Sequence, residues 1–238
     1  MVSAINDARA ELAEREKAGN LSGRAVPIDI VTFERTDTAA DDEDRTGADD
    51  ARVSPYREAT PQVPLGQEMH EVSSGVMAEL VEQVVAVEGP IHVDEVVVRL
   101  RTAWGLQRAG GRIQAAVERG ADIGVQRGRL VRKGEFLSIP DQLVLVRDRS
   151  DVLSGSLRKL EALPPEELEA AVVHVARTGL GATPDEVAAA APRLLGFKSV
   201  SGQLRQAVVA AIARLEESGA LGREAGLLII KDAGTGRS

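Results

Sequence analysis

The stretch Trp104–Val117, WGLQRAGGRIQAAV, decides the fold of this chain, because it returns 91 positions later as Leu195–Val208, LGFKSVSGQLRQAV. The match continues upstream without a gap, where Asp94–Val96 falls on Asp185–Val187, and it continues downstream in the same register. An internal repeat of this kind defines the architecture of a chain before any other signal is considered. The sequence therefore predicts one small domain used twice.

Apolar spacing divides the first copy into three helices and a hairpin. Residues three and four apart are apolar in Val76–Val87, in His92–Trp104 and in a third segment that begins near Ala109, as on the buried face of a helix. Two short strands follow, Arg129–Arg132 and Glu135–Ile139, joined by a tight turn that contains a glycine. Three helices followed by a β-hairpin is the plan of a winged helix-turn-helix domain.

The second copy has clearer helix boundaries than the first. Pro165 and the two glutamates after it begin its first helix, Thr183 caps the second helix, and Ser201 caps the third. In the third helix of the first copy, Gly120 and Gly124 stand on the apolar stripe, where each costs about 1 kcal/mol relative to alanine. We expect the C-terminal half of that helix to be loose or short.

The N-terminal region differs from the repeats in composition. Asn6–Lys17 predicts a short helix, either frayed in water or the end of a helix whose partners lie in another chain. Ala25–Glu34 is either a piece of linker or one strand that adds to another protein's sheet. The linker continues to Gly66 through the acidic run TDTAADDEDRTGADD and three prolines, which predict disorder.

The predicted fold class is mainly α with small β-hairpins, as tandem winged helix-turn-helix domains after a disordered acidic N-terminal region. Between the repeats, the apolar run in Gln142–Asp148 predicts a strand that extends a sheet or packs against the first domain. The predicted domains are a short helix plus acidic linker (1–70), winged helix 1 (71–140), a connector (141–164), winged helix 2 (165–231) and a disordered tail (232–238).

Composition excludes several classes of protein. The chain has no cysteine, which rules out disulfide frameworks and thiolate metal sites. No apolar run approaches the roughly 20 residues needed to cross a bilayer, and the N-terminus lacks the charged-then-apolar order of a secretion signal. We therefore expect a cytoplasmic protein with no membrane partner.

The net charge of −8 is unevenly distributed. Residues 1–70 hold 15 acidic and 8 basic side chains, whereas Arg99–Lys133 holds 9 basic and 2 acidic ones. That basic stretch covers the third helix and hairpin of the first copy, the elements through which helix-turn-helix proteins contact DNA. The alternatives are a basic face that is simply solvated, or one that docks on an acidic protein surface. The predicted nucleic-acid-binding residues are Arg108, Arg112, Arg119, Arg127, Arg129, Arg132 and Lys133.

Enzyme motifs are nearly absent from the sequence. Gly110-Gly111 lacks the lysine and the preceding strand of a phosphate-binding loop. The three histidines stand in different elements, and we interpret His92 as part of a polar helix N-terminus and His174 as the half-buried edge of a core. We expect no catalytic residue, no metal site and no cofactor.

Three segments of the chain resemble a known family: Val87–Gly120, Arg127–Leu137 and Arg193–Leu204. They are similar to an uncharacterised bacterial C-terminal module, domain of unknown function 3320, and the resemblance extends over roughly Pro55–Ile230. The resemblance implies a place at the end of very large superfamily I helicase-like proteins, after an ATPase core and a Vsr-like nuclease domain. It implies no catalytic residue for this chain. The helix that ends AVERGADIGVQRG departs from the family by having glycines in place of helix formers.

Besides an enzyme whose active site the sequence does not reveal, two functional hypotheses remain open at this point. The first is a non-catalytic tandem winged-helix module that binds DNA through its first copy and is accessory to a helicase or nuclease system. The second is a protein-interaction module that docks on a helicase or another partner without contacting DNA.

Overall fold

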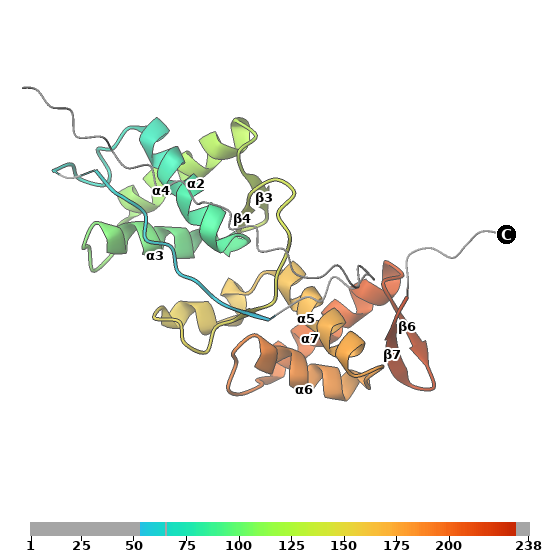
Figure 1. Cartoon of the computed structure of the whole chain (residues 1–238). Helices are drawn as coiled ribbons and strands as arrows, with labels where there is room; N and C mark the ends of the chain where they lie inside the picture. Colours follow the sequence, from blue (N-terminus) through green and yellow to red (C-terminus); the bar gives the residue numbers. More distant parts are fainter. Residues whose placement is uncertain (1–52, 65, 232–238) are drawn as a thin grey trace, which may run out of the picture. The chain divides into compact units, whose positions relative to one another are not determined.

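The structure, a computed structural model, describes residues 53–64 and 66–231 (Figure 1). This part of the chain is mainly α-helical, with six α-helices and three small sheets. None of its helices is long and apolar enough to span a bilayer. The predicted helix at Asn6–Lys17, the predicted strand at Ala25–Glu34, the acidic run that follows it and the tail at 232–238 lie outside the described residues.

The first repeat consists of three helices and a three-stranded antiparallel sheet in the order β2-β4-β3. Apolar side chains from all three helices form its core, together with Leu130 and Leu137 at the hairpin. Figure 1 shows the hairpin (yellow-green) beside the helices (teal to green). The elements are α2 (Ser74–Glu88), β2 (Ile91–His92), α3 (Val93–Ala103), α4 (Gly111–Gln126), β3 (Val131–Lys133) and β4 (Phe136–Ser138).

The second repeat has the same element order and the register that the sequence predicts. Its second and third helices have bounds 91 positions after those of α3 and α4. An isolated β-bridge joins Ala182 to Leu228, and it occupies the place of the Ile91–Leu137 pair of the first sheet. The elements are α5 (Pro165–Thr178), α6 (Pro184–Leu194), α7 (Gly202–Glu217), β6 (Leu221–Glu224) and β7 (Leu227–Ile230).

The predicted caps of the second repeat are confirmed. The Thr183 hydroxyl accepts a hydrogen bond from the backbone N–H of Glu186 at 3.3 Å, and the Glu186 carboxylate accepts one from the Thr183 N–H at 2.8 Å. The Ser201 hydroxyl accepts from the N–H of Leu204 at 3.2 Å. Each contact satisfies a backbone donor at a helix start that has no partner within the helix.

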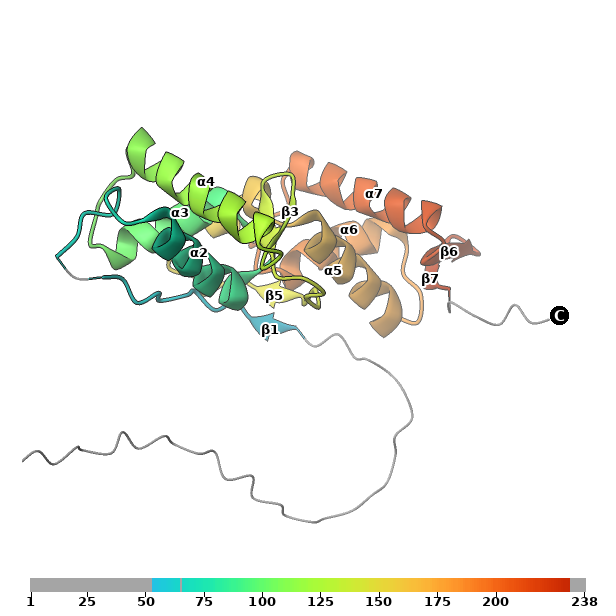
Figure 2. The ribbon, with the colours of Figure 1, turned by 90° about the horizontal axis from the view of Figure 1, so that it is seen from above.

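Helix α4 corrects the expectation of a loose or short C-terminal half, because it runs unbroken to Gln126. A Cβ added at Gly120 would lie 2.8 Å from the Cγ of Met77 in α2 and 3.1 Å from its carbonyl oxygen. A Cβ at Gly124 would lie 2.7 Å from a methyl carbon of Leu130. The glycines therefore allow α2 and the hairpin to pack directly on α4, and this packing outweighs their low helix propensity. Figure 2 shows α2 beside α4 along its length.

The prediction of a disordered linker up to Gly66 is wrong for the last part of that segment, which directly precedes the first repeat. Residues 53–64 have defined positions, and Ala59 and Met69 are buried in the first core. We call residues 53–64 the strap. Its two-residue strand β1 (Ser54–Pro55) pairs in parallel with β5 (Arg147–Asp148) of the connector, and the two lie side by side in Figure 2.

The connector also differs from expectation. Within Gln142–Asp148, only the last two residues form a strand, and that strand pairs with the strap instead of extending a hairpin sheet. Leu143 and Leu145 are exposed, whereas Val146 is buried in the core of the second repeat. Of the four apolar side chains in this run, one is therefore buried and two are exposed.

Candidate nucleic-acid interface

The outward face of α4 presents two of the predicted arginines. Arg112 and Arg119 are exposed and stand seven residues apart, which places them about 20° apart around a helix of 3.6 residues per turn. The opposite face of α4 is buried through Val117, Ala121 and Gly124. Burial of that face therefore determines that both guanidinium groups point to solvent.

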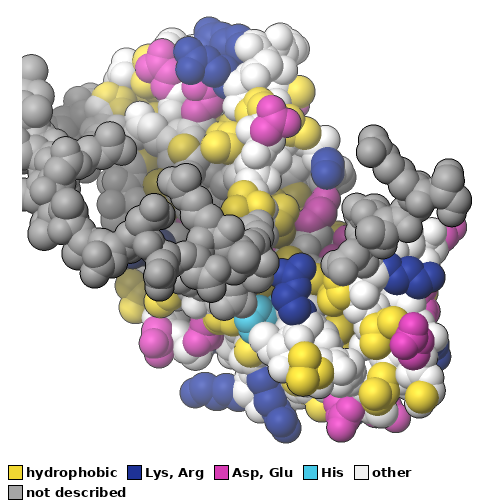
Figure 3. All heavy atoms as spheres, turned by 45° about the vertical axis from the view of Figure 1, so that its right-hand side comes forward, with side chains coloured by type: hydrophobic (Ala, Val, Ile, Leu, Met, Phe, Trp, Pro, Cys, Tyr) yellow, Lys and Arg dark blue, Asp and Glu magenta, His cyan; other side chains and the backbone are white. Residues whose placement is uncertain are grey.

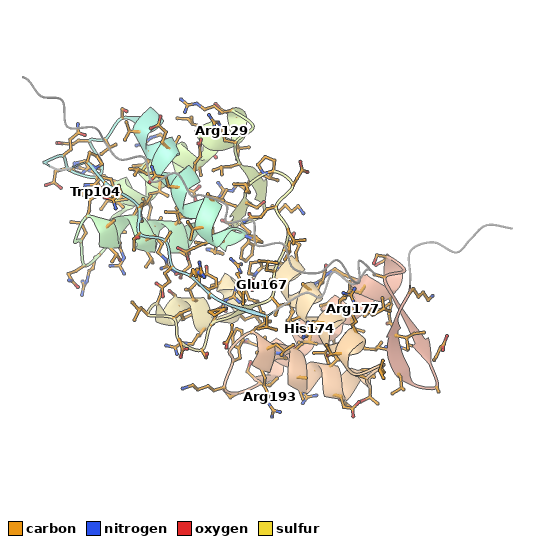
Figure 4. The ribbon with its side chains drawn as sticks, in the orientation of Figure 1. Trp104, Arg129, Glu167, His174, Arg177 and Arg193 are labelled. Atoms are coloured by element: carbon orange, nitrogen blue, oxygen red, sulfur yellow. The ribbon has the colours of Figure 1, made fainter. Side chains whose placement is uncertain are left out.

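Two further predicted arginines follow α4 where the chain turns into the hairpin. Arg127 and Arg129 are exposed and flank Gly128, whose φ of 67° is the left-handed conformation that glycine adopts without strain. Figure 4 shows Arg129 at the hairpin end of the first repeat. Arg108 is exposed in the turn that precedes α4. These residues therefore lie before, along and after one helix.

The remaining two predicted residues are engaged in ion pairs. Arg132 lies 2.7 Å from Glu118, 3.6 Å from Asp122 and 3.5 Å from Glu135, and the hydrogen bond to Glu118 raises its pKa further above the ordinary arginine value. Lys133 lies 3.3 Å from Glu166 of α5, in a pair that is largely open to solvent. Arg132 therefore holds the hairpin against α4, and its positive charge is compensated.

Two more arginines of the basic stretch have structural contacts. Arg99 is buried and pairs with Glu88 and Glu95. Arg101 donates hydrogen bonds to the carbonyls of Leu106 and Gln107 at 3.1 and 2.8 Å. The local excess of charge counted in the sequence is thus larger than the charge that is available to a ligand.

Five arginines of the first repeat remain exposed, and none of their guanidinium groups makes a hydrogen bond or ion pair with any other residue that the structure describes. We call these five the exposed arginine set. On the face seen in Figure 3, basic side chains occur in separate groups with acidic ones beside several of them, so the charge available to a ligand comes from particular residues. The set consists of Arg108, Arg112, Arg119, Arg127 and Arg129.

The second repeat replaces every member of this set with an uncharged residue. Arg132, which is paired, is matched by Arg223, which is also paired, with Glu216. Among the arginines predicted to bind nucleic acid, the second repeat therefore keeps a counterpart only for the paired Arg132. The residues 91 positions after the exposed arginine set are Ser199, Gln203, Ala210, Ser218 and Ala220.

The histidines lie where the sequence interpretation puts them. His92 is the N-cap of α3, and its Nδ1 accepts a hydrogen bond from the N–H of Asp94 at 3.2 Å. His174 is half-buried on α5, which Figure 4 shows in the second repeat, and His70 is exposed. The described part of the chain contains no group of three His, Asp or Glu side chains that could hold a metal ion.

Comparison with known proteins gives one match. Residues 67–115 match the family model described as a protein of unknown function, DUF3320. The matched segment covers α2, α3 and the start of α4, so it includes Arg108 and Arg112. No curated protein and no solved structure matches the chain.

Sequence reasoning missed a group of buried charges around the connector between the repeats. Glu88, Glu167 and Arg149 are each no more than 1 % exposed, and Arg147 is 8 % exposed. One signal was present in the sequence: Glu88 ends a helix that has no basic residue in its last turn, and an acid at a helix C-terminus is unfavourable without a nearby cation. The other members had no local signal.

Proposed function

We propose that each repeat is a winged helix-turn-helix domain and that the first repeat binds DNA through the exposed arginine set. The helix-turn-helix comprises α3 and α4, with α4 as the recognition helix and the β3–β4 hairpin as the wing. The observation that supports this proposal is the contrast between the repeats. The guanidinium groups of the exposed arginine set have no partner among the described residues, and these arginines are replaced in the second repeat, whereas the paired Arg132 has a paired counterpart in Arg223.

Arginines placed before, along and after α4 suit contacts with phosphates. Guanidinium groups bind phosphate oxygens with paired hydrogen bonds, and such contacts position a protein on DNA without reading its sequence. Side chains at the preceding turn and the following wing contact the backbone beside a groove that α4 would enter. We therefore propose binding to duplex DNA that depends little on base sequence and strongly on salt.

Fluorescence anisotropy of the full chain with labelled duplex DNA, measured over a salt series, tests this proposal. Five phosphate contacts predict a slope of log K against log salt of about −4.5, because each contact on duplex DNA contributes about −0.9. Replacing Arg112 and Arg119 with the second repeat's residues, as Arg112→Gln with Arg119→Ala, removes two contacts. We expect that variant to bind more weakly and its slope to become shallower by about 2.

A matched control comes from the second repeat. Lys198 and Arg205 are exposed, and their counterparts 91 positions earlier are Gln107 and Gln114. The variant Lys198→Gln with Arg205→Gln removes the same total charge, so it tests whether position or net charge matters. We expect it to bind DNA with the slope of the wild type.

The results separate the proposal from its alternative. Equal losses in the two double variants would show that net charge alone controls the affinity, and the interface would then not be at α4. If the wild type binds no duplex DNA at low salt, the protein-interaction hypothesis replaces this one. A specific observation favours that hypothesis for the second repeat, where the exposed face of α7 is uncharged at Gln203, Ala210 and Ala213 and bears Val209, which is 53 % exposed.

We further propose that the chain has no catalytic activity of its own and is accessory to a helicase or nuclease system. Its resemblance to domain of unknown function 3320 supports this role, together with the family-model match at residues 67–115. The purified chain should hydrolyse neither ATP nor DNA. An activity that a single carboxylate or histidine substitution abolishes would contradict this part of the proposal.

A further inference from the structure

A cluster of buried charges joins the two repeats through the strap and the connector. The exposed fraction is 0 % for Glu88 at the end of α2 and 0 % for Glu167 at the start of α5. Two connector residues, Arg147 and Arg149, lie between these acids, and Tyr56 of the strap completes the group. Figure 4 shows Glu167 where α5 begins, next to the connector. We call these five residues the inter-repeat clamp.

The guanidinium of Arg147 contacts both repeats at once. It donates to the carbonyl of Glu88 at the end of α2, at 2.5 Å, and to that of Pro90 just before β2, at 2.9 Å. It also donates to the carboxylate of Glu167 at 2.6 Å, in α5. One side chain therefore satisfies acceptors from the first and second repeats together.

Arg149 completes the environment of the same carboxylate. Its guanidinium donates to both oxygens of Glu167, at 2.8 and 2.6 Å. Burial alone would raise the pKa of Glu167, but the hydrogen bonds and charges of Arg149 and Arg147 outweigh it, and the pKa lies below the ordinary value. The carboxylate is thus ionised and held by two cations.

The strap contributes the remaining contacts. The ring of Tyr56 lies 4.8 Å from the guanidinium carbon of Arg147 and 4.8 Å from that of Arg149, within the range of cation–π attraction. The Tyr56 hydroxyl donates to Glu88 at 2.9 Å, and Glu88 also accepts from Arg99 at 2.7 Å. Displacement of the Tyr56 side chain would therefore remove contacts from Glu88 and from both connector arginines, Arg147 and Arg149.

We propose that the inter-repeat clamp makes the two repeats open and close as one cooperative unit. Breaking a buried ion pair by removing one partner leaves an uncompensated charge out of water, which is far more costly than losing an exposed pair. If the second repeat opened alone, Arg147 and Arg149 would lose Glu167 while remaining against Glu88 and Tyr56. Separate opening of either repeat is therefore penalised, although tandem repeats without such a contact open independently.

Native-state hydrogen exchange of the full chain in rising urea tests the proposal without any substitution. We expect the slowest amides of α2 and of α5 to exchange through one common opening reaction, which has the same free energy and the same dependence on urea for both helices. Amides of α5 that exchange through a separate opening at lower urea, while α2 stays closed, would overturn the proposal.

Two variants locate the effect at the clamp. Glu167→Gln keeps the shape and removes the charge, and we expect the slowest α2 amides, in the other repeat, to exchange on the order of 100-fold faster. Tyr56→Phe keeps the ring and removes one hydrogen bond to a charged group, and we expect about a tenfold effect in α2 and α5 alike. Faster exchange confined to α5 in Glu167→Gln would mean that the contact is local, and the clamp would not couple the repeats.

The matched control is Glu169→Gln on the same helix. Glu169 pairs with Arg214 at 2.6 Å inside the second repeat, and this pair is partly open to solvent. Removing an exposed pair changes stability little, so we expect less than about a threefold change in the α2 amides. An effect as large as that of Glu167→Gln would assign the coupling to the helix as a whole and overturn the role of the clamp.

Discussion

The substitution Gly120→Ala should destabilise this protein, although the same change stabilises most helices. Gly120 is buried in the middle of α4, and an added Cβ would lie 2.8 Å from the Cγ of Met77 and 3.1 Å from its carbonyl carbon and oxygen. Carbon atoms in ordinary contact lie about 3.5–4.0 Å apart. Met77 is 1 % exposed, and its backbone belongs to α2, so α2 would have to move away from α4.

Two effects of opposite sign determine the size of the destabilisation. Alanine in place of glycine favours a helix interior by about 1 kcal/mol. An extra methyl group in a filled core costs about 1–3 kcal/mol, and we expect the upper part of that range because a backbone carbonyl cannot rotate away. The free energy of unfolding should therefore fall by about 1–2 kcal/mol, which lowers Tm by about 2–8 °C for a folded unit of this size.

Thermal unfolding followed by circular dichroism measures this change, and two other glycines of α4 provide the controls. At Gly124 the nearest atoms belong to the flexible end of the Leu130 side chain, at 2.7 Å, so alanine should cost less there than at Gly120. Nothing lies within 4 Å of a Cβ added at Gly111, so alanine should be neutral or slightly stabilising. A rise in Tm for Gly120→Ala would refute the close packing of α2 on α4 and restore the simple propensity argument.

Three further predictions concern a helix cap and two titrating groups. Ser201→Ala should lower the free energy of unfolding by about 1 kcal/mol and Ser201→Gly by only a few tenths, as denaturant titration would show, because glycine suits an N-cap far better than alanine. The pKa of Glu167 is lower in the folded protein than its ordinary value of about 4.3. Its ionised carboxylate therefore contributes fully to stability above about pH 4.3, and this contribution is lost as pH falls through the pKa of the folded state. Acid unfolding of Glu167→Gln should show a smaller loss of stability than that of the wild type. Burial, and then the charge of Glu88, raise the pKa of Tyr56 in the folded protein. The contribution of Tyr56 to stability is therefore full below about pH 10 and declines as pH rises further. Tyr56→Phe should abolish this loss of stability at alkaline pH, as unfolding followed by the fluorescence of Trp104 would show.

The elements of the fold could be predicted from the sequence because they depend on local patterns. Apolar spacing located the helices, the hydroxyl residues at Thr183 and Ser201 located two helix starts, and the 91-residue register located matching elements in both repeats. The glycines of α4 misled the prediction, because propensity describes an isolated helix and says nothing of a neighbour that needs the space. The position of Met77 against Gly120 is a long-range fact that one sequence does not contain.

The sequence predicted which residue types the candidate site contains, but it did not predict which of its positive charges are left unpaired by the described residues. Arg132 and Arg129 look alike in the sequence, yet Arg132 is neutralised by carboxylates that folding brings to it. Apart from the signal at Glu88, the clamp could not be predicted for the same reason, since Arg147 and Glu167 are 20 residues apart and belong to residue types that ordinarily lie at the surface. Their joint burial depends on how the connector and the strap meet.

The contact of Arg147 with α2 has a consequence for how this protein can be divided. Peptide dipoles give the C-terminal end of a helix a partial negative charge, which a nearby cation compensates. Helix α2 has no basic residue in its last turn, and Arg147 meets its final carbonyls from 59 positions further along the chain. A fragment cut at the end of the first hairpin, near residue 140, would retain every element of the first repeat and still leave the end of its first helix without a counter-charge. The structural boundary of the first repeat therefore extends past its last strand, to at least Arg147.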